Sequence, residues 1–153
     1  MKLAEALLLR SDLQKDLVWI KEHLAKGSRV QEGEKPAEDP AALIERTEKR
    51  ASELTTLMVR INSANLAQRD DRGRTLTELL AQRDVLKIKH SIYTAAYAEA
   101  TGADERYSRS EIRLQRTFDM SDMRRRIEQL SRELRQVNGS IQQLNWQVDI
   151  EDL

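Results

Sequence analysis

Hydrophobic residues recur along most of this chain at alternating steps of three and four, the spacing of one face of an α-helix. The first stripe continues from Leu3 to Leu24, and Gly27 follows it as a helix-ending residue. The last stripe is the most regular, keeping a seven-residue rhythm from Met123 to Val148. The pattern predicts four long helices, over about 2–26, 40–68, 76–100 and 121–146.

Local signals between the stripes support these helix ends. Asp39 is a favourable N-cap, and Pro40 suits the first helical position because its missing N–H is not needed there. In the helix that follows, we expect one set of residues to form the core stripe, with two leucines beside it. The stripe is Ile44, Thr47, Ala51, Leu54, Met58 and Ile61, and the leucines are Leu43 and Leu57.

The segment before the last helix changes period. Apart from Arg116, every second residue from Ile112 to Met120 is apolar, which is typical of a strand. We therefore expect an extended or two-stranded β arm over about 107–120, and the short segment 29–32 is its candidate partner. The pairing can lie within one chain or between chains.

The fold class that follows is mainly all-α: an antiparallel four-helix bundle of long, coiled-coil-like helices forming a single helical domain over 1–153. Only 5 glycines and 2 prolines interrupt the chain, which fits this class. Narrow seven-residue stripes with few large side chains make a thin core, and a second copy can complete such a core. The expected partner is therefore the protein itself, as a homo-oligomer.

Composition narrows the function classes. Lys plus Arg and Asp plus Glu both number 26, so the formal net charge is zero, and there is no cysteine for a thiolate site or disulfide. No apolar run reaches the roughly 20 residues of a membrane span. The first ten residues lack a signal-peptide pattern because Glu5 interrupts them. We expect a cytoplasmic protein that does not bind membranes.

Several short segments resemble a family of small bacterial helical proteins. They are Arg29–Pro40, Ile61–Asn65, Thr75–Thr77, Arg83–Leu86 with His90, Ser108–Ile112 and Asn145–Trp146. In this order they resemble the septicolysin-like family from residue 1 to about 146. The resemblance implies a helical protein of unknown function, and it carries over no catalytic residues.

A polar group interrupts the apolar stripe of the third predicted helix. His90 shares a helical face with Arg83 and Tyr97, and Asp84 is next to Arg83. These residues can form a pocket in which His90 acts as an acid or base, or a buried network that fixes helix register. The second interpretation is favoured. Two histidines without metal-binding spacing predict no metal site, and no motif indicates a cofactor or a catalytic residue.

Two further sets of polar residues are candidates. In an antiparallel bundle Asn62 and Asn65 can meet Trp146, whose indole N–H needs an acceptor, although capping and packing are favoured over a ligand site. A basic segment contains Arg106, Arg109, Arg113, Arg116, Arg124, Arg125 and Arg126. It can bind nucleic acid phosphates, but the neutral chain favours ion pairs at a surface or subunit interface.

The favoured function is therefore a non-enzymatic oligomeric helical protein acting through protein–protein contacts. The alternatives are nucleic-acid binding through residues 106–126, and a small-molecule or hydrolytic site near Arg83, Asp84 and His90.

Overall fold

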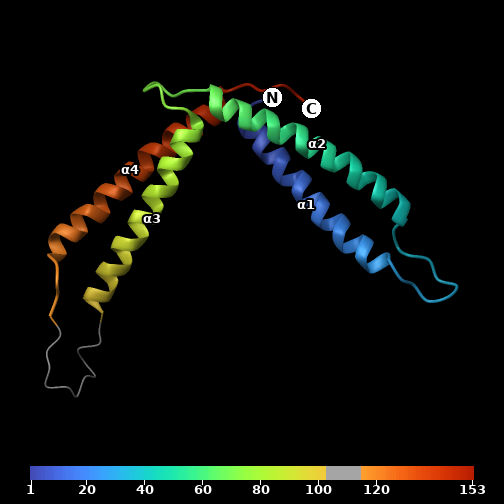
Figure 1. The fold of residues 1–153 in the computed structure, drawn as a ribbon, viewed down its shortest axis with the longest axis horizontal. Helices are drawn as coiled ribbons and strands as arrows, with labels where there is room; N and C mark the ends of the chain where they lie inside the picture. Colours follow the sequence, from blue (N-terminus) through green and yellow to red (C-terminus); the bar gives the residue numbers. More distant parts are fainter. Residues whose placement is uncertain (103–114) are drawn as a thin grey trace, which may run out of the picture. The chain divides into compact units, whose positions relative to one another are not determined.

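A computed structural model describes residues 1–102 and 115–153, and four helices make up most of them (Figure 1). In chain order they are α1 (Leu3–Gly27), α2 (Pro40–Ala67), α3 (Leu76–Thr101) and α4 (Met120–Gln147). Over this described part of the chain, the all-α class with four helices is therefore confirmed. The contacts divide the chain into two compact units, which are Met1–Leu76 with Gln142–Leu153, and Thr77–Ile141.

Capping residues define where two of the helices begin. The Asp39 side chain accepts a hydrogen bond of 3.1 Å from the Ala41 N–H, and Pro40 occupies the first position of α2. At α4 the side chain of Asp119 accepts a 3.0 Å bond from the Asp122 N–H. Each carboxylate satisfies an N–H that has no partner inside its helix, which stabilises these two ends.

The core of the first unit lies between α1 and α2, which run antiparallel and side by side (Figure 1). The buried side chains of these two helices are Leu3, Ala6, Leu13 and Ile20 from α1 and Leu43, Leu57, Ile61 and Ala64 from α2. The expected stripe of α2 is partly wrong, because Ile44 and Met58 are 53% and 42% exposed. Leu43 and Leu57, one position earlier, are buried in their place.

The expected β arm is not supported. Within the described residues neither 29–32 nor 115–119 contains a strand, and residues 103–114 of the arm lie outside the described part. Backbone pairing occurs elsewhere. An isolated antiparallel bridge joins Lys2 to Asp149, with the Leu3 N–H donating to the Val148 carbonyl at 2.9 Å. The residues that flank α1 and α4 thus satisfy each other's backbone groups.

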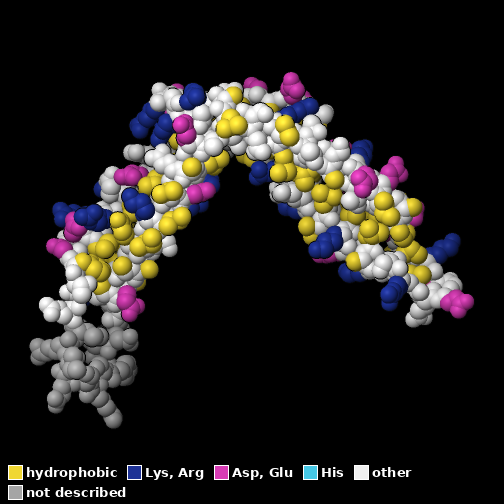
Figure 2. Space-filling view, viewed as in Figure 1, with side chains coloured by type: hydrophobic (Ala, Val, Ile, Leu, Met, Phe, Trp, Pro, Cys, Tyr) yellow, Lys and Arg dark blue, Asp and Glu magenta, His cyan; other side chains and the backbone are white. Residues whose placement is uncertain are grey.

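In the second unit α3 and α4 also run antiparallel (Figure 1). Leu79 and Leu86 of α3 are buried there, as are Leu130, Val137 and Ile141 of α4. Hydrophobic side chains are not confined to these cores. The space-filling view shows them on the surface of both units (Figure 2).

Candidate functional site

His90 forms part of a polar layer between α3 and α4. Its Nε2 atom lies 3.0 Å from the hydroxyl of Ser131 on α4, and its Nδ1 atom lies 3.5 Å from the hydroxyl of Thr94. Apolar layers with buried Leu86 and Leu130 lie nearby in the sequence. A partly buried hydrogen bond at this position fits only one alignment of the two helices, so the arrangement favours a role in register.

The other polar residues of α3 do not join this layer. The Arg83 guanidinium pairs with the adjacent Asp84 carboxylate at 2.8 Å, and this pair makes no hydrogen bond to His90. Tyr97 uses its backbone carbonyl to accept a 3.0 Å bond from the Thr101 hydroxyl. The structure therefore places these predicted residues on one helix without forming one network among them. The small-molecule or hydrolytic site stays a prediction.

The predicted meeting of Asn62, Asn65 and Trp146 involves residues of the first unit. The side chains of Trp146 and Asn62 are exposed, and no hydrogen bond joins them within residues 1–102 and 115–153. Asn145, the neighbour of Trp146, is buried instead. The side chain that packs at this end of α4 is therefore the asparagine, and the indole faces solvent.

The basic segment is described only in part. Arg106, Arg109 and Arg113 lie outside the described residues. Arg116 donates a 3.0 Å bond to the Ala100 carbonyl at the end of α3. Arg124 pairs with Glu128 at 3.2 Å.

Asp122 holds the remaining two arginines of the segment. Arg126 contacts one carboxylate oxygen at 2.7 Å and Arg125 contacts the other at 3.2 Å. The hydrogen bond from Arg126 is the main cause that lowers the pKa of Asp122. The same bond raises the pKa of Arg126. These local pairs fit the expectation that the arginines form surface ion pairs, while their exposure leaves them accessible to other anions.

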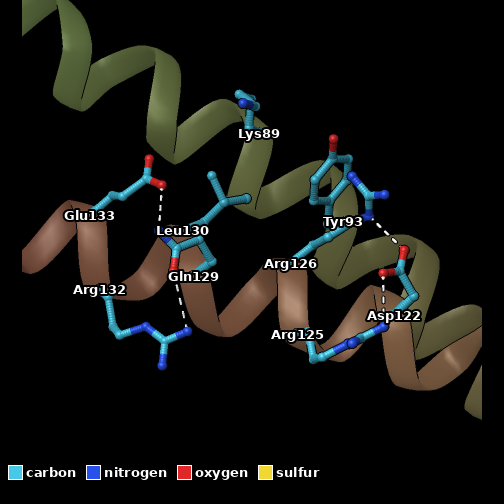
Figure 3. A pocket seen from close by; sticks show the side chains of 9 residues that line it. All are labelled: Lys89, Tyr93, Asp122, Arg125, Arg126, Gln129, Leu130, Arg132 and Glu133. Atoms are coloured by element: carbon cyan, nitrogen blue, oxygen red, sulfur yellow. Dashed lines mark hydrogen bonds and ion pairs between the residues drawn. The ribbon is translucent and has the colours of Figure 1, made fainter.

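A shallow groove of about 460 Å³ lies beside these arginines, along the α3 and α4 pair (Figure 3). We call it the α3–α4 groove, and its lining is Lys89, Tyr93, Asp122, Arg125, Arg126, Gln129, Leu130, Arg132 and Glu133. Arg132 donates to the Gln129 side-chain oxygen at 3.2 Å, and Gln129 donates to Glu133 at 2.9 Å. Four cationic side chains against two carboxylates give the groove a positive balance, so it is suited to anions.

A cluster of charged and aromatic side chains that was not predicted from the sequence joins α1 to α2. Arg46 binds both carboxylate oxygens of Asp16, and Arg50 binds the same carboxylate at 3.0 Å. The Arg46 guanidinium also lies 5.2 Å from the ring centre of Trp19, which stacks on His23 at 3.9 Å. The two arginines are four residues apart on one helix face, a visible signal, but only the packed hairpin shows which carboxylate they meet.

No helix in the described part of the chain is long and apolar enough to cross a membrane. Over residues 1–102 and 115–153 there is also no cluster of three or more His, Asp or Glu side chains arranged to hold a metal ion.

Comparison with known proteins places the chain among proteins without an assigned role. Residues 10–150 match a family described as a family of unknown function, DUF6847. The chain belongs to the DUF6847 family. The expected resemblance to the septicolysin-like family is wrong, because the match over nearly the whole chain is to DUF6847 and no link to septicolysin appears. Short shared segments were not specific enough to identify the family.

A solved structure supports the fold of this DUF6847 protein. It is the crystal structure of a functionally unknown conserved protein from Corynebacterium diphtheriae, with 34% sequence identity and a TM-score of 0.90. The match covers 99% of each chain, so the two proteins are similar along their whole length. No curated protein matches the chain.

Proposed function

We propose that this protein is a non-enzymatic homo-oligomer that works through protein–protein contacts. The observation that supports the proposal is the exposure of large hydrophobic side chains on both units (Figure 2). They include Leu8, Val18, Ile44, Met58, Val59, Leu66, Val85, Ile88 and Ile92. Single exposed apolar residues are ordinary, but groups of them on one face are typical of interaction surfaces.

The architecture of each unit gives a physical reason for this exposure. Two antiparallel helices can bury only the sides that face each other, so apolar residues on any other side stay in water. A second hairpin packed on the first produces a four-helix bundle with a thicker core. In our proposal the bundle is thus completed between copies, by coiled-coil-like contacts between their long helices.

The mass of the protein in solution tests the proposal. Light scattering after size exclusion, repeated over a range of concentrations, should give a mass that is a multiple of the 17.7 kDa chain. A mass of one chain at every concentration would rule out the homo-oligomer. Native mass spectrometry of the same samples gives the number of copies and checks the result independently.

Nucleic-acid binding is a second candidate, and the positive balance of the α3–α4 groove favours it. Phosphates of a single strand can exchange with the exposed ion pairs of Arg124, Arg125 and Arg126, because such pairs contribute little in water. Polyanion binding should then weaken steeply as salt is raised.

A triple variant tests this candidate against a control of equal charge. Replacing Arg124, Arg125 and Arg126 by alanine should abolish low-salt binding of a fluorescent oligonucleotide. Replacing the exposed Lys21, Lys26 and Arg29 by alanine removes the same charge from the other unit and should leave binding unchanged. Equal losses in both variants would mean that only net charge matters and would contradict a site at the groove.

A further inference from the structure

Helix α3 carries apolar side chains on two separate faces. Leu79 and Leu86 lie on the face that packs in the second unit, and both are buried. Val85, Ile88 and Ile92 are 57%, 60% and 58% exposed. At 100° per residue the mean direction of these three differs from that of the buried pair by about 140°. A helix that is apolar on both sides is typical of one with packing partners on both sides.

The exposed residues form a regular seam. From Ala81 the steps to Val85, Ile88, Ile92 and Ala95 are four, three, four and three, and all five side chains are exposed. This is the spacing of positions a and d in a heptad repeat, with Val85 and Ile92 at a and Ile88 at d. We call these five residues the outer stripe of α3. Its spacing predicts another long helix as the partner.

We propose that the outer stripe binds the outer stripe of a second copy, with the two α3 helices parallel. This inference rests on the proposed homo-oligomer and specifies its interface. The residues beside the stripe favour a second copy over an unrelated helix, because their charges are complementary to themselves. Asp84 precedes Val85 at position g, and Lys89 follows Ile88 at position e.

The charges also determine the direction of the pairing. In a parallel pair, position g of one helix faces position e of the next heptad in the other. Asp84 then meets Lys89 of the second copy, and the symmetry repeats this ion pair. In an antiparallel pair g faces g and e faces e. Lys89 then meets Gln82, Ala96 or another Lys89, and no opposite charges come together.

Both charged groups can make this contact in the folded chain. Arg83 binds the Oδ1 atom of Asp84 through Nε at 2.9 Å and a second nitrogen at 2.8 Å. Oδ2 of Asp84 has no hydrogen bond or ion pair with the residues that the structure describes. Lys89 is exposed and is likewise without an ion pair in that part of the chain. Lys89 lines the α3–α4 groove and occupies position e, so on the helix surface it lies between the outer stripe and the face that packs on α4.

Single cysteines test both the face and the direction, because the natural chain contains none. Val85→Cys, Ile88→Cys and Ile92→Cys should each form a disulfide-linked dimer under mild oxidation, since a parallel pair brings every stripe position next to itself. Lys87→Cys is the matched control, exposed on the same helix but outside the stripe, and it should stay monomeric on a non-reducing gel. In an antiparallel pair no more than one of the three positions can meet itself.

Failure of the interface and failure of the homo-oligomer are distinguishable. If light scattering gives a multiple of the chain mass but the stripe positions cross-link no better than Lys87→Cys, the outer stripe is not the interface and the oligomer stands. Cross-linking at one stripe position alone overturns the parallel direction. A monomeric wild-type protein at every concentration overturns both proposals.

Charge reversal tests the flanking ion pairs without touching the seam. Asp84→Lys and Lys89→Asp each place like charges opposite each other, so each variant should dimerise about tenfold more weakly. A mixture of the two variants restores opposite charges and should form a heterodimer with the wild-type dissociation constant. A mixture that associates no better than either variant alone contradicts the pairing. Circular dichroism checks that both variants are folded.

Discussion

The Nε2 atom of His90 on α3 lies 3.0 Å from the hydroxyl of Ser131 on α4, and this contact is partly buried. Neither residue forms an ion pair in the described part of the chain, so the contact between them is a hydrogen bond without a charged partner. Such a bond adds little net free energy, but leaving one partner without the other is unfavourable in a partly buried place. The contact therefore disfavours other alignments of the hairpin.

Replacing Ser131 by alanine tests this role. The variant leaves His90 Nε2 without its partner and should lower the free energy of unfolding by about 1 kcal/mol in urea titrations. Ser91→Ala, on an exposed position of α3, controls for the higher helix propensity of alanine and should be neutral or slightly stabilising. Equal effects of the two substitutions would show that the bond to His90 does not contribute.

In the hairpin of α1 and α2, substitution of Asp16 should change stability more than substitution of an exposed carboxylate. Its side chain is only 18% exposed and accepts bonds from Arg46 and Arg50. Asp16→Asn removes the charge that both guanidiniums face, and it should destabilise the protein by about 1 kcal/mol. Asp12→Asn breaks an exposed pair with Lys15 at 3.3 Å and should change stability by about 0.3 kcal/mol or less. Raising the salt concentration should reduce the stability change of Asp12→Asn before it reduces that of Asp16→Asn.

The helices could be predicted from the sequence because their signals are local. Asp39 and Pro40 begin α2 by their own chemistry, whatever the helix later packs against. The buried face of α2 could not be predicted in the same way. A stripe through Ile44 and Met58 and one through Leu43 and Leu57 both satisfy helical spacing, and only packing against α1 selects the second.

The candidate site shows the same division between local and distant information. The positive charge around Arg125 and Arg126 is visible in the sequence, and so is Asp122 within one helical turn. The contribution of Lys89 to the same groove could not be predicted, because it depends on how α3 lies against α4. The bridge between Lys2 and Asp149 could not be predicted either, because 147 residues separate the two partners along the chain.

Acid should destabilise the loop that precedes α3, because it protonates Asp70. Its carboxylate binds the Arg74 guanidinium at 2.7 Å and accepts bonds from the Arg74 and Arg72 N–H groups at 2.9 and 3.0 Å. The side-chain bond from Arg74 is the main cause that lowers the pKa of Asp70 below its ordinary value of 3.8. A carboxylate with a lowered pKa stabilises the folded state above the unfolded pKa, and this contribution is lost as pH falls through the folded value.

The measurement is the urea midpoint of wild type and Asp70→Asn between neutral pH and pH values below 3.8. The variant should be less stable at neutral pH, and the difference should shrink in acid as wild-type Asp70 becomes protonated. Asp71→Asn is the control, because that side chain is exposed and has no ion pair within residues 1–102 and 115–153. A difference that stays constant with pH would contradict an ionised Asp70 as its source.

Two glycines should respond to alanine in opposite directions. Gly73 has a φ of +79°, a conformation that alanine adopts only with strain, so Gly73→Ala should lower stability by about 1 kcal/mol. Gly139 lies within α4 with nothing within 4 Å of an added Cβ, so Gly139→Ala should raise stability by about 0.5–1 kcal/mol. Both variants add one methyl group in open space, so only the backbone conformation differs. Thermal unfolding midpoints that shift in the same direction would contradict the turn at Gly73.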